Sequence, residues 1–114
     1  MDSLDQEVLD RLGRDMGGSE AVSRIITMYL GKLPAEVAGL HDLQASGDLP
    51  GLGESAHRMK SSTAMLGATL LAGILAEIEA TARAGEGEAV TRWLTEFDLE
   101  VPRVERDMRS LISP

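Results

Sequence analysis

The stretch Ser55–Ala68, with the sequence SAHRMKSSTAMLGA, is the part of this 114-residue chain from which the fold can be worked out. Successive residues of an α-helix are rotated by about 100°, and at that angle the side chains opposite His57 form one stripe. The stripe begins one turn before the stretch, and its members are apolar or small: Leu52, Ser55, Met59, Ser62, Thr63 and Leu66. We therefore expect a helix that buries this stripe and presents His57 to solvent.

Two helices are expected before this stretch. The first is short and ends near Gly17-Gly18, because glycine adopts the left-handed conformation that closes helices. Ser19 is then placed to cap a second, longer helix with apolar residues at three- and four-residue steps. This helix should stop at Ser46-Gly47, and Pro34 should kink it or split it in two.

The helix that carries His57 has its own start and stop signals. Asp48 can cap it, and Pro50 falls in the first turn, where the missing amide hydrogen costs little. We expect the helix to run to about Gly67.

Two further helices are expected after Gly67. Apolar residues over 71–82 mark a fourth helix that Gly85 and Gly87 should close. The last helix has a heptad-like spacing of apolar residues over 90–111, and Pro102 should bend it.

Four helices with short connections and a short helix before them predict an all-α fold. The simplest arrangement is an antiparallel up-down-up-down four-helix bundle with an additional N-terminal helix. The sequence does not predict β-strands, because no segment long enough for a strand alternates apolar and polar residues. We expect residues 1–114 to form a single domain.

Composition excludes several classes of function. The chain has 19 acidic and 11 basic residues, and its net charge of −8 repels nucleic acids and anionic membranes. It has no cysteine, and its two histidines are far apart, so disulfides, redox chemistry and a structural metal site are not expected. We find neither an apolar run of the roughly 18 residues that a membrane span needs nor a GxxxxGK[ST] loop for ATP.

His57 is the candidate functional residue, because its neighbours on the same side of the helix are mostly small. Free histidine has a pKa of about 6.5, so at pH 7 it is mostly neutral and one ring nitrogen can attack. Lys60 follows three residues later, where its ammonium group can neutralise an anion attached to the imidazole. Another protein is expected to dock around this pair, on Gly53, Glu54, Ser61, Ala64, Met65 and Ala68.

This segment resembles the phosphoacceptor helix of histidine-containing phosphotransfer (Hpt) domains. The family motif is His-x-x-Lys-Gly, followed by small residues, an apolar residue and glycine. Ser61 stands in place of the first glycine; serine is small and can hydrogen-bond the phosphoryl group or the imidazole, so we interpret it as a tolerated variant. The matching residues are His57, Lys60, Ser62, Thr63, Ala64, Leu66 and Gly67.

The resemblance implies a histidine phosphocarrier in a multistep two-component phosphorelay. Hpt domains accept a phosphoryl group from the aspartyl phosphate of a receiver domain and pass it to another receiver. His57 would be the phosphoacceptor, and Lys60 would stabilise the charge of the phosphoryl group. The implied partners are response-regulator receiver domains or a hybrid histidine kinase, and the divalent metal ion would belong to the receiver.

The same resemblance implies a cytoplasmic protein, and we expect a monomer because a monomer suffices for the mechanism. It would be a phosphotransfer intermediate and not an enzyme, with no cofactor of its own. Two alternatives stay open: a helical-bundle adaptor that only binds partners, and the phosphoacceptor domain of a chemotaxis-type histidine kinase. Such a kinase normally continues into further domains, whereas this sequence stops at Pro114, so we expect a free-standing carrier.

We assign no function to His41. It lies near the C-terminus of a helix, where a histidine can interact favourably with the helix dipole.

Overall fold

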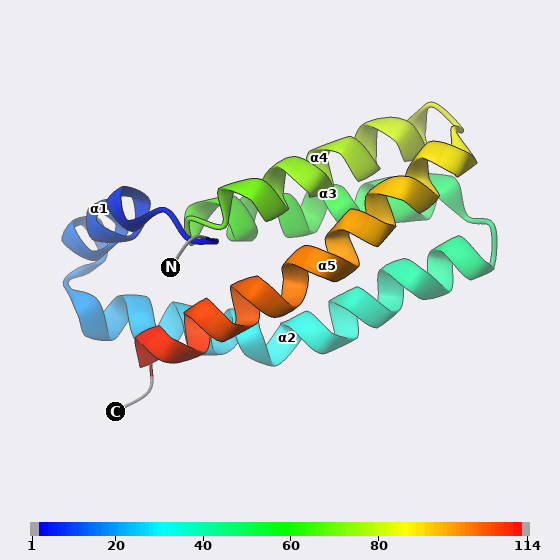
Figure 1. Cartoon of the computed structure of the whole chain (residues 1–114). Helices are drawn as coiled ribbons and strands as arrows, with labels where there is room; N and C mark the ends of the chain where they lie inside the picture. The colour runs from blue at the N-terminus through cyan, green and yellow to red at the C-terminus, as the bar shows by residue number, and fades with distance from the viewer. Residues whose placement is uncertain (1–2, 113–114) are drawn as a thin grey trace.

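Five α-helices make up almost all of residues 3–112, the part of the chain that the structure, a computed structural model, describes (Figure 1). The predicted all-α fold is confirmed, and these residues contain no strand. The helices are α1 (Gln6–Met16), α2 (Ser19–Ala45), α3 (Leu49–Met65), α4 (Thr69–Arg83) and α5 (Gly87–Ile112).

Helices α2 to α5 run alternately up and down, as predicted, and form an elongated bundle of 42 × 21 × 21 Å (Figure 1). Each helix packs against the next along the chain, and α5 returns to contact α2, which closes the bundle. The most extensive contact is between α3 and α4. The short α1 lies at one end, where it contacts α2 and α3.

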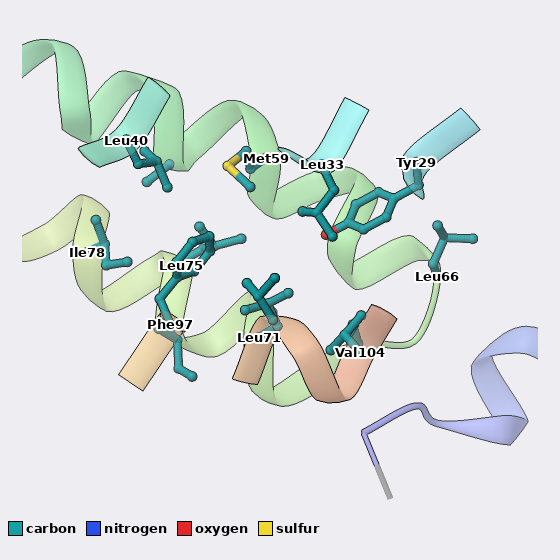
Figure 2. Packing of buried hydrophobic residues seen from close by; sticks show 14 of the residues in the cluster. Tyr29, Leu33, Leu40, Met59, Leu66, Leu71, Leu75, Ile78, Phe97 and Val104 are labelled. Carbon is teal, nitrogen blue, oxygen red and sulfur yellow. The ribbon is translucent and has the colours of Figure 1, made fainter. Parts of the chain in front are cut away.

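The core is mostly aliphatic, and the ring of Phe97 is fully buried in it (Figure 2). At one side of the core Tyr29 of α2 and Thr63 of α3 share a hydrogen bond of 2.7 Å between their hydroxyl groups. Burial raises the pKa of Tyr29 to about 12. Each helix adds residues at three- and four-residue steps, among them Leu33, Leu40, Met59, Leu66, Leu71, Leu75, Ile78 and Val104.

The helix ends follow the predicted signals with two exceptions. Asp48 caps α3 by accepting a hydrogen bond from the backbone of Gly51. The prediction that Ser19 caps α2 is wrong, because the preceding glycine, Gly18, is the cap and Ser19 is the first helical residue. The prediction that Gly87 closes α4 is also wrong: the left-handed Gly85 suffices for the turn, and Gly87 already begins α5.

The two internal prolines do not divide their helices. Helix α2 is one element through Pro34, and α5 is one element through Pro102, so a split at Pro34 is excluded. The ring of Pro34 faces solvent, while Leu33 and Leu40 of the same helix are buried in the core. Tertiary packing of this apolar stripe therefore outweighs the loss of one helical hydrogen bond.

The turn between α3 and α4 is the place where the N-terminal segment is attached. Gly67 has a left-handed φ of +79°, and its carbonyl accepts a hydrogen bond of 2.8 Å from the backbone N–H of Asp5. A Cβ atom on Gly67 would lie only 2.8 Å from the carbonyl oxygen of Asp5. Both the backbone angle and the close approach therefore require glycine.

We expect Gly67→Ala to lower the free energy of unfolding by about 1–3 kcal/mol, because it strains the backbone and pushes the N-terminal segment away. Gly73→Ala is the matched control. Gly73 lies within α4 with open space around its Cα, so alanine there should leave stability unchanged or raise it by up to about 1 kcal/mol. Urea unfolding followed by circular dichroism measures both, and equal effects of the two substitutions would refute this explanation.

Candidate functional site

His57 lies in the middle of α3 with its side chain 54% exposed, as the sequence predicts. The stripe on the opposite side of the helix faces the core. Four of its members are buried and the two serines are half-buried: Leu52, Met59, Thr63 and Leu66, then Ser55 and Ser62. The rigid helix therefore presents the imidazole at the surface of the bundle.

Glu79 of α4 holds the site together. One carboxylate oxygen, Oε2, lies 2.9 Å from Nδ1 of His57, and the other, Oε1, accepts a hydrogen bond of 2.7 Å from Nζ of Lys60. Arg83, one turn further along α4, forms an ion pair with Oε2. The side chain of Glu79 is only 9% exposed, so this carboxylate is an anion largely removed from solvent with three basic partners.

Gly53 explains how α4 comes close enough to place Glu79 beside His57. A Cβ atom at Gly53 would lie 3.3 Å from Cγ of Arg83 and 3.5 Å from the carbonyl oxygen of Glu79. The missing side chain thus allows α4 to pack closely on the first half of α3. This close contact lies one turn along α3 from His57.

The carboxylate determines which nitrogen of His57 carries the proton. An ionised glutamate only accepts hydrogen bonds, so Nδ1 of His57 must be the donor in the contact with Glu79. In the neutral imidazole the other nitrogen, Nε2, then has its lone pair available. The contact with Glu79 therefore leaves a lone pair on Nε2 of the exposed imidazole.

Glu79 is ionised at neutral pH. The hydrogen bond from Lys60 lowers the pKa of Glu79 below its ordinary value, and the His57 hydrogen bond and the charge of Arg83 lower it further. Burial acts in the opposite direction but does not prevail. Both the tautomer of His57 and the position of Lys60 thus depend on a carboxylate that keeps its charge.

The expected docking residues divide into an exposed and a buried group. Glu54, Ser61 and Ala64 are exposed around His57, and Met65 is 43% exposed. The prediction that Gly53 and Ala68 lie on this surface is wrong. Gly53 is covered by α4, and Ala68 is fully buried where the chain enters α4.

Sequence reasoning missed Glu79 and Arg83, although one signal was present. Glu79 occupies a position in the buried stripe of α4, one residue after Ile78 and four after Leu75. A charged residue is rarely buried without a partner, so this break in an apolar stripe indicates an ion-pair site. What the sequence could not indicate is that two of the partners, His57 and Lys60, come from α3.

Three other observations concern the described residues. His41, to which we assign no function, has its Nε2 atom 2.8 Å from Asp98 of α5, and both side chains are exposed. Among residues 3–112 no group of three or more His, Cys, Asp or Glu side chains is arranged to hold a metal ion. In the same part of the chain no helix is both long and apolar enough to cross a membrane.

We expect Glu79→Gln to lower the free energy of unfolding by about 1–3 kcal/mol at pH 7, because Lys60 and Arg83 lose their common anion. Since the pKa of Glu79 is lowered in the folded state, the carboxylate adds full stability above the ordinary glutamate value of 4.5. This contribution disappears as the pH falls below that value, so the wild type and the variant should converge in acid. Urea unfolding at pH 7 and at acid pH measures the difference, with the exposed Glu77→Gln as control. A difference independent of pH would contradict the role of the charge.

Comparisons with known proteins identify the family of this chain. The family model of the Hpt domain matches residues 24–107. The phosphorelay protein LuxU of Vibrio harveyi is 32% identical over 85 residues, which cover 75% of this chain and 74% of that protein. The crystal structure of histidine-containing phosphotransfer protein B (HptB) from Pseudomonas aeruginosa PAO1 superimposes with a TM-score of 0.87 at 27% identity, covering 95% of this chain and 92% of that one. The chain therefore belongs to the Hpt domain family of histidine phosphotransfer carriers, which act in phosphorelays.

Proposed function

We propose that this chain accepts a phosphoryl group on Nε2 of His57 from the aspartyl phosphate of a receiver domain and passes it to the aspartate of another receiver. One observation carries this assignment: Glu79 binds Nδ1 of His57 and leaves Nε2 free on an exposed side chain. The other histidine, His41, uses Nε2 in its contact with Asp98 and has no lysine beside it on the helix surface.

The transfer needs little from the carrier beyond position and charge. The aspartyl phosphate of the donor is already activated, so an in-line approach of Nε2 to phosphorus is the main requirement. Lys60 supplies an ammonium group that can bind the phosphoryl oxygens. Its ammonium group has three N–H donors, and one hydrogen bond to Glu79 leaves two for the oxygens of a phosphoryl group on His57.

This mechanism assigns the remaining chemistry to the partner. The divalent metal ion belongs to the receiver domain, and the carrier uses no cofactor of its own. As an intermediate that is phosphorylated and dephosphorylated by its partners, it is not an enzyme. It meets its partners one at a time as a monomer, in the cytoplasm, where receiver domains and the kinases that phosphorylate them operate.

The docking surface in this proposal is the exposed ring of residues around His57. It comprises Glu54, Ser61, Ala64 and Met65, which lie on α3 beside the imidazole. Small side chains at Ser61 and Ala64 allow the phosphorylated aspartate of a receiver to come close to Nε2. Ser61 adds a hydroxyl group where the family motif has glycine, and that hydroxyl can donate to a phosphoryl oxygen.

Transfer of radiolabelled phosphate from phosphorylated receiver domains of the source organism tests the assignment. We expect acid-labile label on the wild type and on His41→Gln, and none on His57→Gln, because only His57 combines a free Nε2 with a neighbouring ammonium group. Circular dichroism confirms that each variant is folded. Label on His57→Gln would show that another residue is the acceptor, and no label from any receiver on the folded wild type would favour an adaptor bundle.

The docking surface has a separate test. Ala64→Arg places a long charged side chain on this surface, so the receiver concentration that gives half-maximal transfer should rise by about tenfold or more. Ala38→Arg, at an exposed position of α2, makes the same change elsewhere and should have no effect. Labelling by phosphoramidate, a small phosphoryl donor that needs no docking, should be the same for both variants. If Ala64→Arg leaves the half-maximal concentration unchanged, the receiver docks elsewhere.

A further inference from the structure

The group of charges around Glu79 has one more positive than negative charge. Lys60 and Arg83 each carry one positive charge, Glu79 carries one negative charge, and His57 is neutral when Nε2 has its lone pair. The pair of Lys60 and Glu79 is therefore balanced without Arg83. Without Arg83 the group would be neutral, so the surplus positive charge depends on Arg83 as well as on Lys60.

Phosphorylation of His57, as proposed above, makes the net charge of this group more negative by one. The lone pair of Nε2 forms the bond to phosphorus, while the bond between phosphorus and the aspartyl oxygen breaks and its electron pair stays on the receiver's carboxylate. Nδ1 keeps its proton, because it is hydrogen-bonded to Glu79. The ring becomes an imidazolium with one positive charge, and the phosphoryl group brings about two negative charges.

Phosphorylated His57 thus adds one net negative charge, which equals the surplus positive charge at rest. In the onward step the carboxylate of the next receiver attacks phosphorus, and the electron pair of the broken bond returns to Nε2. The imidazole leaves neutral with its proton still on Nδ1. No proton has to enter or leave the site in either direction.

The position of Arg83 is suited to this role. It binds the same carboxylate oxygen, Oε2, that accepts the proton of His57, whereas Lys60 binds the other oxygen. Its aliphatic stem passes over Gly53. While Lys60 shares its N–H groups between Glu79 and a phosphoryl group on Nε2, Arg83 also holds Glu79 against Nδ1.

We propose that Arg83 is a positioning residue of phosphotransfer: it supplies the positive charge that balances phosphorylated His57 and holds Glu79 in place while Lys60 binds the phosphoryl group. The proposal rests on His57 as the acceptor. It distinguishes Arg83 from an ordinary surface ion pair at a helix end, which would affect stability slightly and phosphotransfer not at all.

The test compares the wild type with Arg83→Gln, Arg83→Lys and Arg92→Gln in transfer from one phosphorylated receiver. Two quantities are measured: the equilibrium distribution of phosphate between receiver and carrier, and the single-turnover rate as a function of receiver concentration. Arg92 is exposed on α5, outside the group around Glu79, so Arg92→Gln changes the net charge equally and serves as the control. Because Arg83 is 56% exposed, its replacement should not unfold the protein, and thermal unfolding checks this.

We expect Arg83→Gln to shift the equilibrium toward the phosphorylated receiver by about tenfold and to lower the maximal rate, with the half-maximal receiver concentration unchanged. Arg83→Lys keeps the charge and should restore most of the effect, and Arg92→Gln should match the wild type. This result would support the proposal.

Three outcomes would overturn it. The first is that Arg83→Gln behaves as the wild type. The second is that Arg83→Gln changes only the half-maximal receiver concentration, which would make Arg83 a docking residue. The third is that Arg92→Gln has an equal effect, which would mean that the net charge of the protein causes the change. If the wild type itself takes no label, the assignment of His57 fails instead. Failure of the two proposals can therefore be told apart.

Discussion

The buried carboxylate of Glu79 is the interaction on which the site depends. It joins α4 to two residues of α3, because one oxygen faces His57 and the other Lys60. A carboxylate that is 9% exposed is stable in its charged form only with such partners, and the partners in turn are fixed by it. The tautomer of the histidine and the direction of the lysine are consequences of this one ion.

The helical bundle makes this contact possible by controlling the distance between α3 and α4. Gly53 allows α4 to lie close, and the apolar stripes of both helices fill the core on the other side, where Leu52 and Leu75 are fully buried. The core is close-packed and so resists sliding of one helix along the other. A fixed register between α3 and α4 is what keeps Glu79 level with His57.

The chemistry of the family explains why so simple a site suffices. A carrier receives an activated phosphoryl group and gives it away, so it must hold a nucleophile in one tautomer, balance the charge and leave room for the partner. In the function that we propose, Glu79 meets the first requirement, and Lys60 and Arg83 meet the second. Room for the partner comes from the exposed face of α3, where His57 is surrounded by small or polar side chains.

The amino-acid sequence by itself determined the helices, the aliphatic core and the exposure of His57, because apolar periodicity and caps such as Asp48 act locally. It also placed Lys60 beside His57, since residues three apart share one face of a helix. Only the tertiary structure decided that Glu79 binds both and that Gly53 and Ala68 are buried. The physical reason is that these facts depend on the packing of α4 against α3, a contact between residues about 20 positions apart whose register no local pattern encodes.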